Sequence, residues 1–181
     1  FPEWRSFFRS TRAHNTMEID CCDQSEMLGP FLWGKRADAR CLQWNPSNLG
    51  GEIVAEHDGY HRLSDPVTHQ RRVEMDAGQK TIEIVDTLRS KSHHDLSMTF
   101  QLGEHCSVEQ NSSHQLHIVC GDVRLQMVLP EQLTVRVYRQ DPGTFFGWIS
   151  SGYHVKVPNY SVVCTGSFTG CSEFKTQLLV S

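Results

Sequence analysis

The densest group of polar side chains that could do chemistry lies in residues 9–16, whose sequence is RSTRAHNT. Arg9, Arg12 and His14 stand close together here, although the whole chain has a formal net charge of -4. A guanidinium group binds a carboxylate or sulfate through two parallel hydrogen bonds, and an imidazole can transfer a proton or bind a metal. Because serine, threonine and asparagine are also ordinary turn and helix-cap residues, a purely structural role is an alternative.

A second polar group follows at residues 56–61, EHDGYH, and residues 65–72, DPVTHQRR. Histidine, aspartate and tyrosine together could bind a metal or transfer protons. The alternation of residues 67–75 predicts a strand with His69 and Arg71 on one face and Arg72 on the other. A buried histidine–arginine pair that shares a carboxylate is also a common way to satisfy polar groups in a core, so both interpretations stay open.

A third feature is the aromatic loop that contains Phe145, Phe146 and Trp148, with Tyr153 a few residues further on. Such a loop can stack on sugar rings, or it can close the open end of a β-sandwich. The chain contains no GxSxG sequence, no glycine-rich phosphate loop and no HExxH sequence. The residues alone therefore identify neither a nucleophile with its base nor a complete metal site.

Strands must position these side chains, because the dominant periodicity of the chain is two. Residues 4–12 and 23–28 are ambiguous, and residues 93–95, HHD, are expected to begin a strand after an exposed turn. About a dozen short strands without a long helical pattern predict an all-β fold, an antiparallel β-sandwich. The expected strands are residues 16–20, 41–44, 52–56, 67–75, 81–88, 96–102, 116–120, 123–129, 133–138, 153–157, 161–164 and 174–180.

The length of 181 residues suits one domain, and no interior linker or repeat divides residues 1–181. The slightly acidic charge argues against nucleic acid as a partner, and no apolar run reaches the roughly 18 residues of a membrane helix. Seven cysteines are present. Cys106 with Cys120, and Cys164 with Cys171, could each close a hairpin, but buried free thiols are the favoured interpretation.

Residues 4–16, WRSFFRSTRAHNT, resemble a signature of the heparinase II/III family of polysaccharide lyases, and the likeness covers nearly the whole chain. Members of that family place an α/α toroid before a C-terminal β-sandwich, and the substrate lies in the cleft between them. They cleave uronic-acid-containing polysaccharides by β-elimination, with a tyrosine and a histidine of the toroid transferring the protons. The resemblance continues at residues 23–26, 29–34, 56–60, 69–72 and 84–88.

The resemblance also implies roles for individual residues. A metal ion, often zinc, lies on the β-domain side of the family's cleft, and the histidine of the Ala-His-Asn-Thr motif, here His14, is one of its ligands. The other ligands, a His-x-His segment and an aspartate, precede that motif in the family and have no counterpart here. Arg9 and Arg12 suit substrate binding, because removal of the proton beside a uronate carboxylate builds up negative charge.

We therefore expect residues 1–181 to be the C-terminal β portion of a longer lyase whose toroid is not part of this chain. Its partners would be that toroid and an acidic polysaccharide, with no nucleic acid and no membrane. The fragment alone is expected to hold no zinc, since zinc needs three or four protein ligands, and to be inactive. The resemblance favours a periplasmic or secreted location, with the cytoplasm as the alternative. The alternative function is a non-catalytic carbohydrate-binding or structural β-sandwich module.

Overall fold

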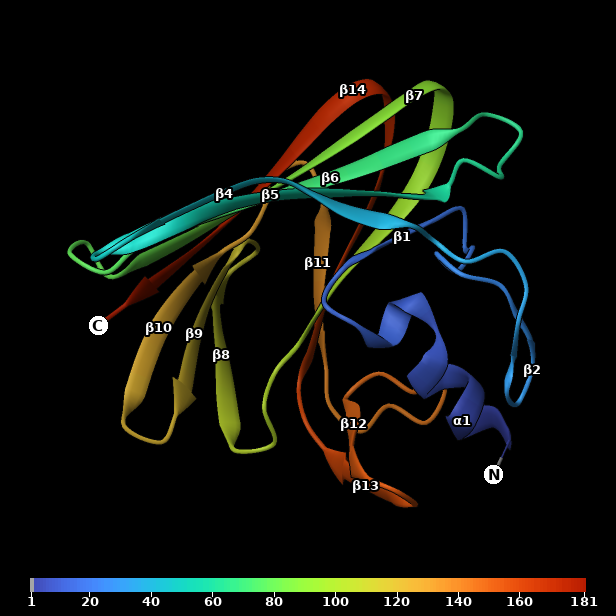
Figure 1. Cartoon of the computed structure of the whole chain (residues 1–181). Helices are drawn as coiled ribbons and strands as arrows, with labels where there is room; N and C mark the ends of the chain where they lie inside the picture. The colour runs from blue at the N-terminus through green and yellow to red at the C-terminus, as the bar shows by residue number, and fades with distance from the viewer. Residues whose placement is uncertain (1) are drawn as a thin grey trace.

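The computed structural model describes residues 2–181. It is an antiparallel β-sandwich, as the periodicity predicts, with a short helix at its N-terminal end (Figure 1). The elements are α1 (Pro2–Arg9), η1 (Thr11–Ala13), β1 (Met17–Ile19), β2 (Met27–Gly29), β3 (Leu32–Trp33), β4 (Ala39–Ser47), β5 (Gly50–Tyr60), β6 (Val67–Asp76), β7 (Thr81–Gln101), β8 (Cys106–Ser112), β9 (Gln115–Cys120), β10 (Val123–Val128), β11 (Thr134–Tyr138), β12 (Trp148–Gly152), β13 (Val155–Pro158) and β14 (Ser161–Val180).

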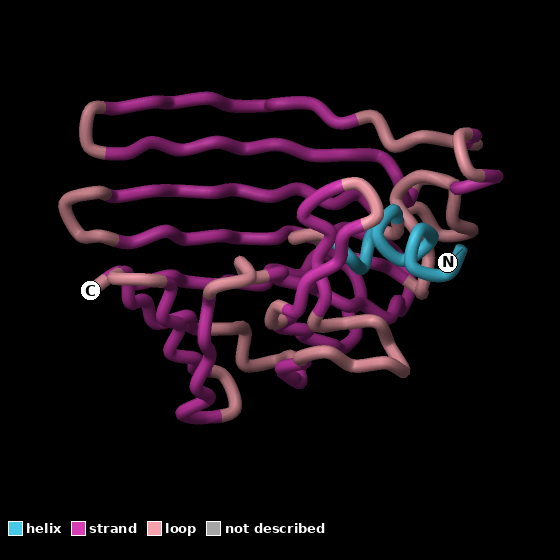
Figure 2. The backbone as a smooth tube through the Cα atoms, turned by 90° about the horizontal axis from the view of Figure 1, so that it is seen from below, coloured by secondary structure: helices cyan, strands magenta, loops and turns pink. Residues whose placement is uncertain are grey.

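The main sheet has the strand order β4-β5-β6-β7-β14-β10-β9-β8, with β1 added to β7 and β11 added to β14. Strands β4 to β7 form a broad ladder, and the helix lies at its opposite end from the hairpin turns (Figure 2). Strand β1 pairs with residues 96–98 of β7 through its own residues 17–19. This pairing brings the segment that follows residues 9–16 onto the sheet.

Two long bent strands, β7 and β14, join the layers of the sandwich. They pair with each other over almost their whole length, with one irregularity beside Gly170, whose φ is +73°. The sequence predicts two shorter strands in each place, and it predicts a strand start at residues 93–95; both predictions are wrong. Pairing between β7 and β14 resumes on both sides of the irregularity, and His93, His94 and Asp95 are partners of Thr169, Phe168 and Ser167, so each chain segment remains one strand.

The main core fills the space between β7, β14 and the β8–β10 segment. Apolar side chains that alternate along these strands, such as Met98, Leu116, Met127 and Phe174, are almost completely buried there. A smaller cluster joins α1 to the loop before β12, where Phe7 and Phe146 are buried. This smaller cluster fixes the helix that carries Arg9.

The cysteines of the described residues are free thiols. The suggested pairing of Cys164 with Cys171 is wrong, because both residues lie along one strand, β14, rather than on two strands of a hairpin. Cys106 and Cys120, in contrast, face each other as direct partners of β8 and β9. Among residues 2–181 no helix is long and apolar enough to cross a membrane.

Candidate functional site

The segment from Ser10 to Thr11 is buried and tied to its surroundings. The Ser10 hydroxyl donates to the Phe7 carbonyl at 2.7 Å, and the Thr11 amide donates to Asp23 Oδ1 at 2.6 Å. The Thr11 hydroxyl accepts from the Gln24 amide at 2.8 Å. For these two residues the structural interpretation is therefore sufficient, and their work is to hold η1 in place.

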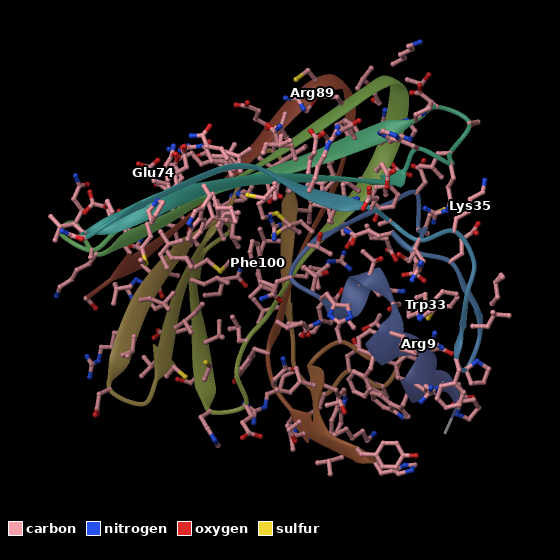
Figure 3. The ribbon with its side chains drawn as sticks, viewed as in Figure 1. Arg9, Trp33, Lys35, Glu74, Arg89 and Phe100 are labelled. Carbon is pink, nitrogen blue, oxygen red and sulfur yellow. The ribbon has the colours of Figure 1, made fainter. Side chains whose placement is uncertain are left out.

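Arg9 lies between α1 and the β2–β3 hairpin. Its guanidinium group donates to the Gly29 carbonyl at 2.9 Å and lies 4.4 Å above the Trp33 ring (Figure 3). Arg5 makes the equivalent pair of contacts one helical turn earlier, with Pro30 and Phe31. Arg9 is half-buried, and these contacts hold its charge in a defined position at the edge of the domain.

Arg12 is held differently from Arg9. Its guanidinium group lies 4.8 Å above the Phe146 ring, and its buried Nε atom has no hydrogen-bond partner among the described residues. The nearby Glu18 carboxyl is buried, and burial raises its pKa although the Arg12 charge opposes that change. Arg12 thus keeps unused hydrogen-bonding capacity.

His14 ends the η1 turn and its side chain is exposed. Its backbone amide donates to the Thr11 carbonyl at 3.1 Å, and its carbonyl accepts from the Thr16 amide at 2.9 Å. Within residues 2–181, no three histidine, cysteine, aspartate or glutamate side chains gather as a metal site would require. The part of the chain that the structure describes therefore offers one exposed imidazole at this position.

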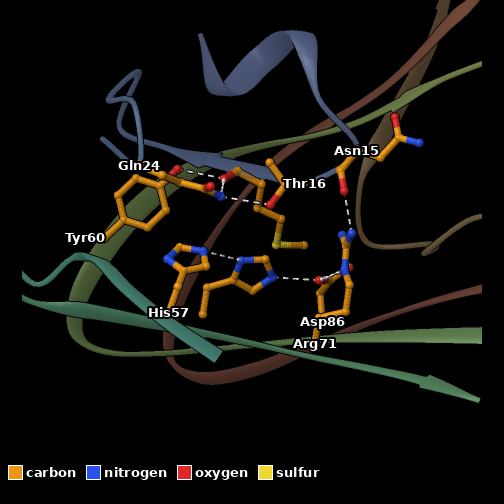
Figure 4. A network of polar contacts seen from close by, with 9 residues as sticks. Asn15, Thr16, Gln24, His57, Tyr60, Arg71 and Asp86 are labelled. Atoms are coloured by element: carbon orange, nitrogen blue, oxygen red, sulfur yellow. Dashed lines mark hydrogen bonds and ion pairs between the residues drawn. The ribbon is translucent and has the colours of Figure 1, made fainter. Parts of the chain in front are cut away.

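A chain of hydrogen bonds lies beneath the segment that contains His14 (Figure 4). The Gly59 amide donates to His57 Nδ1 at 3.2 Å, so the proton of the neutral His57 ring is on Nε2. His57 Nε2 then donates to His69 Nδ1 at 3.0 Å, and His69 Nε2 donates to Asp86 Oδ1 at 2.6 Å. Each ring nitrogen of His57 and His69 is consequently either a donor or an acceptor in this series of hydrogen bonds.

Arg71 connects this chain to the His14 segment. It binds Asp86 through two hydrogen bonds, Nε to Oδ1 at 2.7 Å and Nη2 to Oδ2 at 2.9 Å. Its Nη1 atom donates to the backbone carbonyl of Asn15, and the Asn15 side-chain oxygen accepts from the Gln101 amide at 2.6 Å. Asn15, the residue after His14, is therefore fixed from two sides.

Residues of the second polar group in the sequence therefore hold the segment that contains His14 in place. His69 and Arg71 share one face of β6 and Arg72 lies on the other, bound to Glu52, Glu74 and Glu83, as the alternation predicts. Sequence reasoning missed their shared partner, Asp86, which is completely buried. The available signal was an aspartate near the end of the mostly apolar strand expected at residues 81–88, TIEIVDTL.

The charges in this support are set by burial and by hydrogen bonding. Burial and the neighbouring His69 lower the pKa of His57 to about 4, so the ring is neutral at neutral pH. Burial acts to raise the pKa of Asp86, but hydrogen bonds from His69 and the charge of Arg71 hold it below its usual value. The Asp86 carboxylate is consequently charged beside Arg71, while the His57 ring is neutral.

Tyr60 is a structural residue rather than a proton-transfer group. Its hydroxyl donates to the Met17 carbonyl at 2.7 Å, and its side chain is completely buried. Burial, followed by the nearby Glu18 charge, raises its pKa well above the usual range for tyrosine. Tyr60 therefore fixes β1 against β5 and stays protonated.

Three rings of the aromatic loop, those of Phe145, Phe146 and Trp148, pack against α1, whereas Tyr153 is 87% exposed. The ring centres of Phe145 and Trp4 are 4.6 Å apart, and Phe146, beside Phe7, is only 3% exposed. The Lys156 ammonium lies 3.6 Å from the centre of the Trp4 ring and 4.3 Å from that of Trp148. These rings are therefore engaged with α1 and with Lys156, and the arrangement favours the plug over a sugar-stacking surface.

The family comparison decides the affiliation of the chain. A model described as Heparinase II/III-like, C-terminal, matches residues 2–177. The chain belongs to this family. A search of curated protein sequences gave no match.

Solved structures of lyases share the fold of this heparinase II/III-like domain. The heparan sulfate lyase HepC from Pedobacter heparinus superposes with a TM-score of 0.76 at 16% identity, over 99% of this chain and 26% of the lyase. A heparinase III superposes with a TM-score of 0.73 at 16% identity, over 99% of this chain and 25% of that one. The chain thus spans about a quarter of the length of the lyases that it matches.

A more distant structural neighbour is a putative aldose 1-epimerase from Escherichia coli K12. Its TM-score is 0.50 at 10% identity, over 80% of this chain and 68% of that one. At such identities the likeness concerns the fold alone. The β-sandwich is therefore shared with a protein named for a different reaction, so function has to be argued from particular residues.

Proposed function

We propose that this heparinase II/III-like domain is the C-terminal half of the active-site cleft in a polysaccharide lyase. The lyase would cleave uronic-acid-containing acidic glycans by β-elimination, together with an α/α toroid. Membership of the family and the quarter-length match to heparan sulfate lyases support this proposal. Since surface glycans lie outside the cytoplasm, we place the enzyme in the periplasm or among secreted proteins.

The main support for the proposal is that His14 is exposed, next to Arg12, on a segment whose backbone is held in place. His14 is exposed, whereas the residues on both sides of it are held by Asp23, Arg71 and Gln101. A segment with an exposed imidazole and a rigid backbone is suited to present that imidazole to a group outside the domain.

In the proposed cleft His14 is one ligand of a metal ion, with zinc as the expected metal. A bound zinc ion would supply positive charge close to the substrate. Arg12 and Arg9 would bind the uronate carboxylate and stabilise the negative charge that grows on it as the adjacent proton is removed. The groups that remove and return protons would come from the toroid.

The isolated chain provides a first test. We expect it to contain no stoichiometric zinc and to form no unsaturated uronate product from acidic polysaccharides, because one imidazole cannot hold the metal. Metal analysis and product absorbance measure both quantities on purified protein. Activity above background would contradict the division of the active site between two domains.

The coding sequence ahead of Phe1 provides a second test. A toroid with a tyrosine, a histidine and a His-x-His segment would support the proposal, and an unrelated domain would overturn it. Calorimetry of the isolated chain with acidic oligosaccharides adds an independent measurement. Tight binding by the chain alone would instead indicate a carbohydrate-binding module.

A further inference from the structure

Cys106 and Cys120 form a contact pair that the proposed function does not use. They are direct partners across β8 and β9, which are joined by a single hairpin turn. The two thiols influence each other, because burial and the neighbouring Cys120 thiol raise the pKa of Cys106. Directly opposed residues of antiparallel strands have Cα atoms about 4.5–5.5 Å apart, which is within the range that a disulfide bond requires.

The surroundings of the pair allow a reagent to reach it. Both side chains are partly exposed, and Cys106 also packs against the main core. Neighbouring Gly103 has no side chain, and a methyl group built there would lie 3.6 Å from the Cys106 sulfur. Because the two cysteines are already paired across β8 and β9, a bond between them keeps the register of the two strands.

The other cysteines lack this arrangement. Cys164 is completely buried, and burial raises the pKa of its thiol to about 12, which makes its thiolate rare at neutral pH. Cys41 and Cys171 are exposed, and each lies on a strand without a cysteine opposite it. Cys21 and Cys22 are neighbours in the chain, a spacing that strains a disulfide.

We propose that Cys106 and Cys120 are a thiol modification site that closes to a disulfide in the presence of a small disulfide such as oxidised glutathione. The thiolate of one cysteine attacks the small disulfide, forms a mixed disulfide and releases one small thiolate. The second cysteine thiolate then attacks the mixed disulfide, forms the Cys106–Cys120 bond and releases the other small thiolate. The two protein thiols lose two electrons and two protons, and the oxidant is reduced to two thiols.

The bond would clamp the β8–β9 hairpin at the end next to the β9–β10 turn. A disulfide around a loop of about 15 residues removes conformational freedom from the unfolded chain. For a domain of this size we expect the melting temperature to rise by roughly 5–10 °C on oxidation. Burial raises the pKa of the Cys106 thiol, so the reaction should quicken as the pH rises.

The test is incubation of the reduced chain with oxidised glutathione, followed by peptide mapping without reduction. No lysine or arginine lies between the two cysteines, so trypsin leaves both in one peptide, whereas cleavage after Glu109 separates them. We expect one linked pair of peptides, which contain Cys106 and Cys120, and a higher melting temperature that returns to its starting value on reduction.

Two variants serve as controls for this experiment. In C106S and C120S we expect the remaining cysteine to stop at the mixed disulfide with glutathione and the rise in melting temperature to disappear. Cys171 is exposed and lies elsewhere in the fold, so the variant C171S should behave like the unaltered chain. The proposal would be overturned if the unaltered chain kept two free thiols, formed two separate mixed disulfides or linked either cysteine to a different one. This result comes from the unaltered chain, so it does not depend on the folding of a variant.

Discussion

His94 is the residue whose protonation most directly affects the fold. Its Nδ1 is 2.6 Å from Asp20 Oδ2 and its Nε2 is 3.1 Å from Asp65 Oδ2, and its ring stacks on Phe168. Burial opposes protonation, but the hydrogen bonds to both carboxylates outweigh it and raise the pKa of His94. When it is protonated, the ring links the end of β1, the β5–β6 loop and the bend of β7.

The raised pKa sets the sign of a pH effect. The stabilising contribution is fully present below the unfolded-state pKa of about 6.5, and it disappears as the pH rises through the higher folded-state pKa. We expect His94→Gln to lower the free energy of unfolding most at pH values below about 6.5, and progressively less above it. Urea denaturation across this range measures the difference.

The neighbouring His93 is a matched control for this experiment, because its side chain is 67% exposed and 3.7 Å from the Asp95 carboxylate. His93→Gln should change stability by less than about 0.5 kcal/mol at every pH. A loss in His94→Gln that grew with rising pH would contradict the assignment.

Asp86 is the residue on which the support beneath His14 depends. Its carboxylate receives hydrogen bonds from both His69 and Arg71, and it is completely buried. We expect Asp86→Asn to lower the free energy of unfolding by about 3–5 kcal/mol, because it leaves the Arg71 charge without its partner. Urea denaturation measures this loss.

Asp95 provides the comparison, since it lies on the same strand with a carboxylate that is 82% exposed. Asp95→Asn should cost less than about 0.5 kcal/mol. Equal stabilities for the two variants would show that the buried network does not support the fold. The sequence predicts the faces of His69 and Arg71, but it could not identify Asp86 as their partner, because that contact depends on the pairing of β6 with β7.

At the scale of elements, the connection from β6 to the His14 segment is the central feature. Arg71 reaches from the sheet to the Asn15 carbonyl while it stays in a two-bond contact with Asp86. A lysine has the same charge but lacks the planar donor geometry that makes both contacts at once. We therefore expect Arg71→Lys to loosen the segment while β6 and β7 remain paired.

Hydrogen exchange tests this expectation. In Arg71→Lys the amides that depend on the segment, those of Thr16, Thr99 and Gln101, should exchange about ten-fold faster, as the loss of one charged hydrogen bond implies. Arg72→Lys is the control, because Arg72 lies on the opposite face of β6. Unchanged exchange at these amides in Arg71→Lys would contradict the positioning role.

The elements also show where sequence reasoning stops. A period of two predicts most strands, since alternating residues such as Leu116 and Ile118 do face the core. It divides β7 and β14 at their bend, because polar residues there look like a turn although the ladder continues. It also misses β8 and β12, whose side chains are mostly exposed and therefore lack an apolar stripe.

At the scale of the whole molecule, the sequence predicts the family from residues 4–16 and the family model confirms it over residues 2–177. The motif is informative because its residues serve two purposes, to hold the turn and to expose a histidine. Ser10 and Thr11 are buried and hold the turn, whereas His14 is exposed. Pattern alone could not separate these purposes, since burial depends on how α1 and η1 pack against the sandwich.

The most direct test of the account uses the complete protein encoded by the gene, with His14→Ala compared with His105→Ala. His105 is another exposed histidine, 83% accessible, in the turn between β7 and β8. We expect the unaltered protein and His105→Ala to bind zinc and release unsaturated uronate from an acidic polysaccharide. His14→Ala should lose zinc and at least about 100-fold in rate, as the removal of a metal ligand implies. Full zinc content and full lyase activity in His14→Ala would contradict the account.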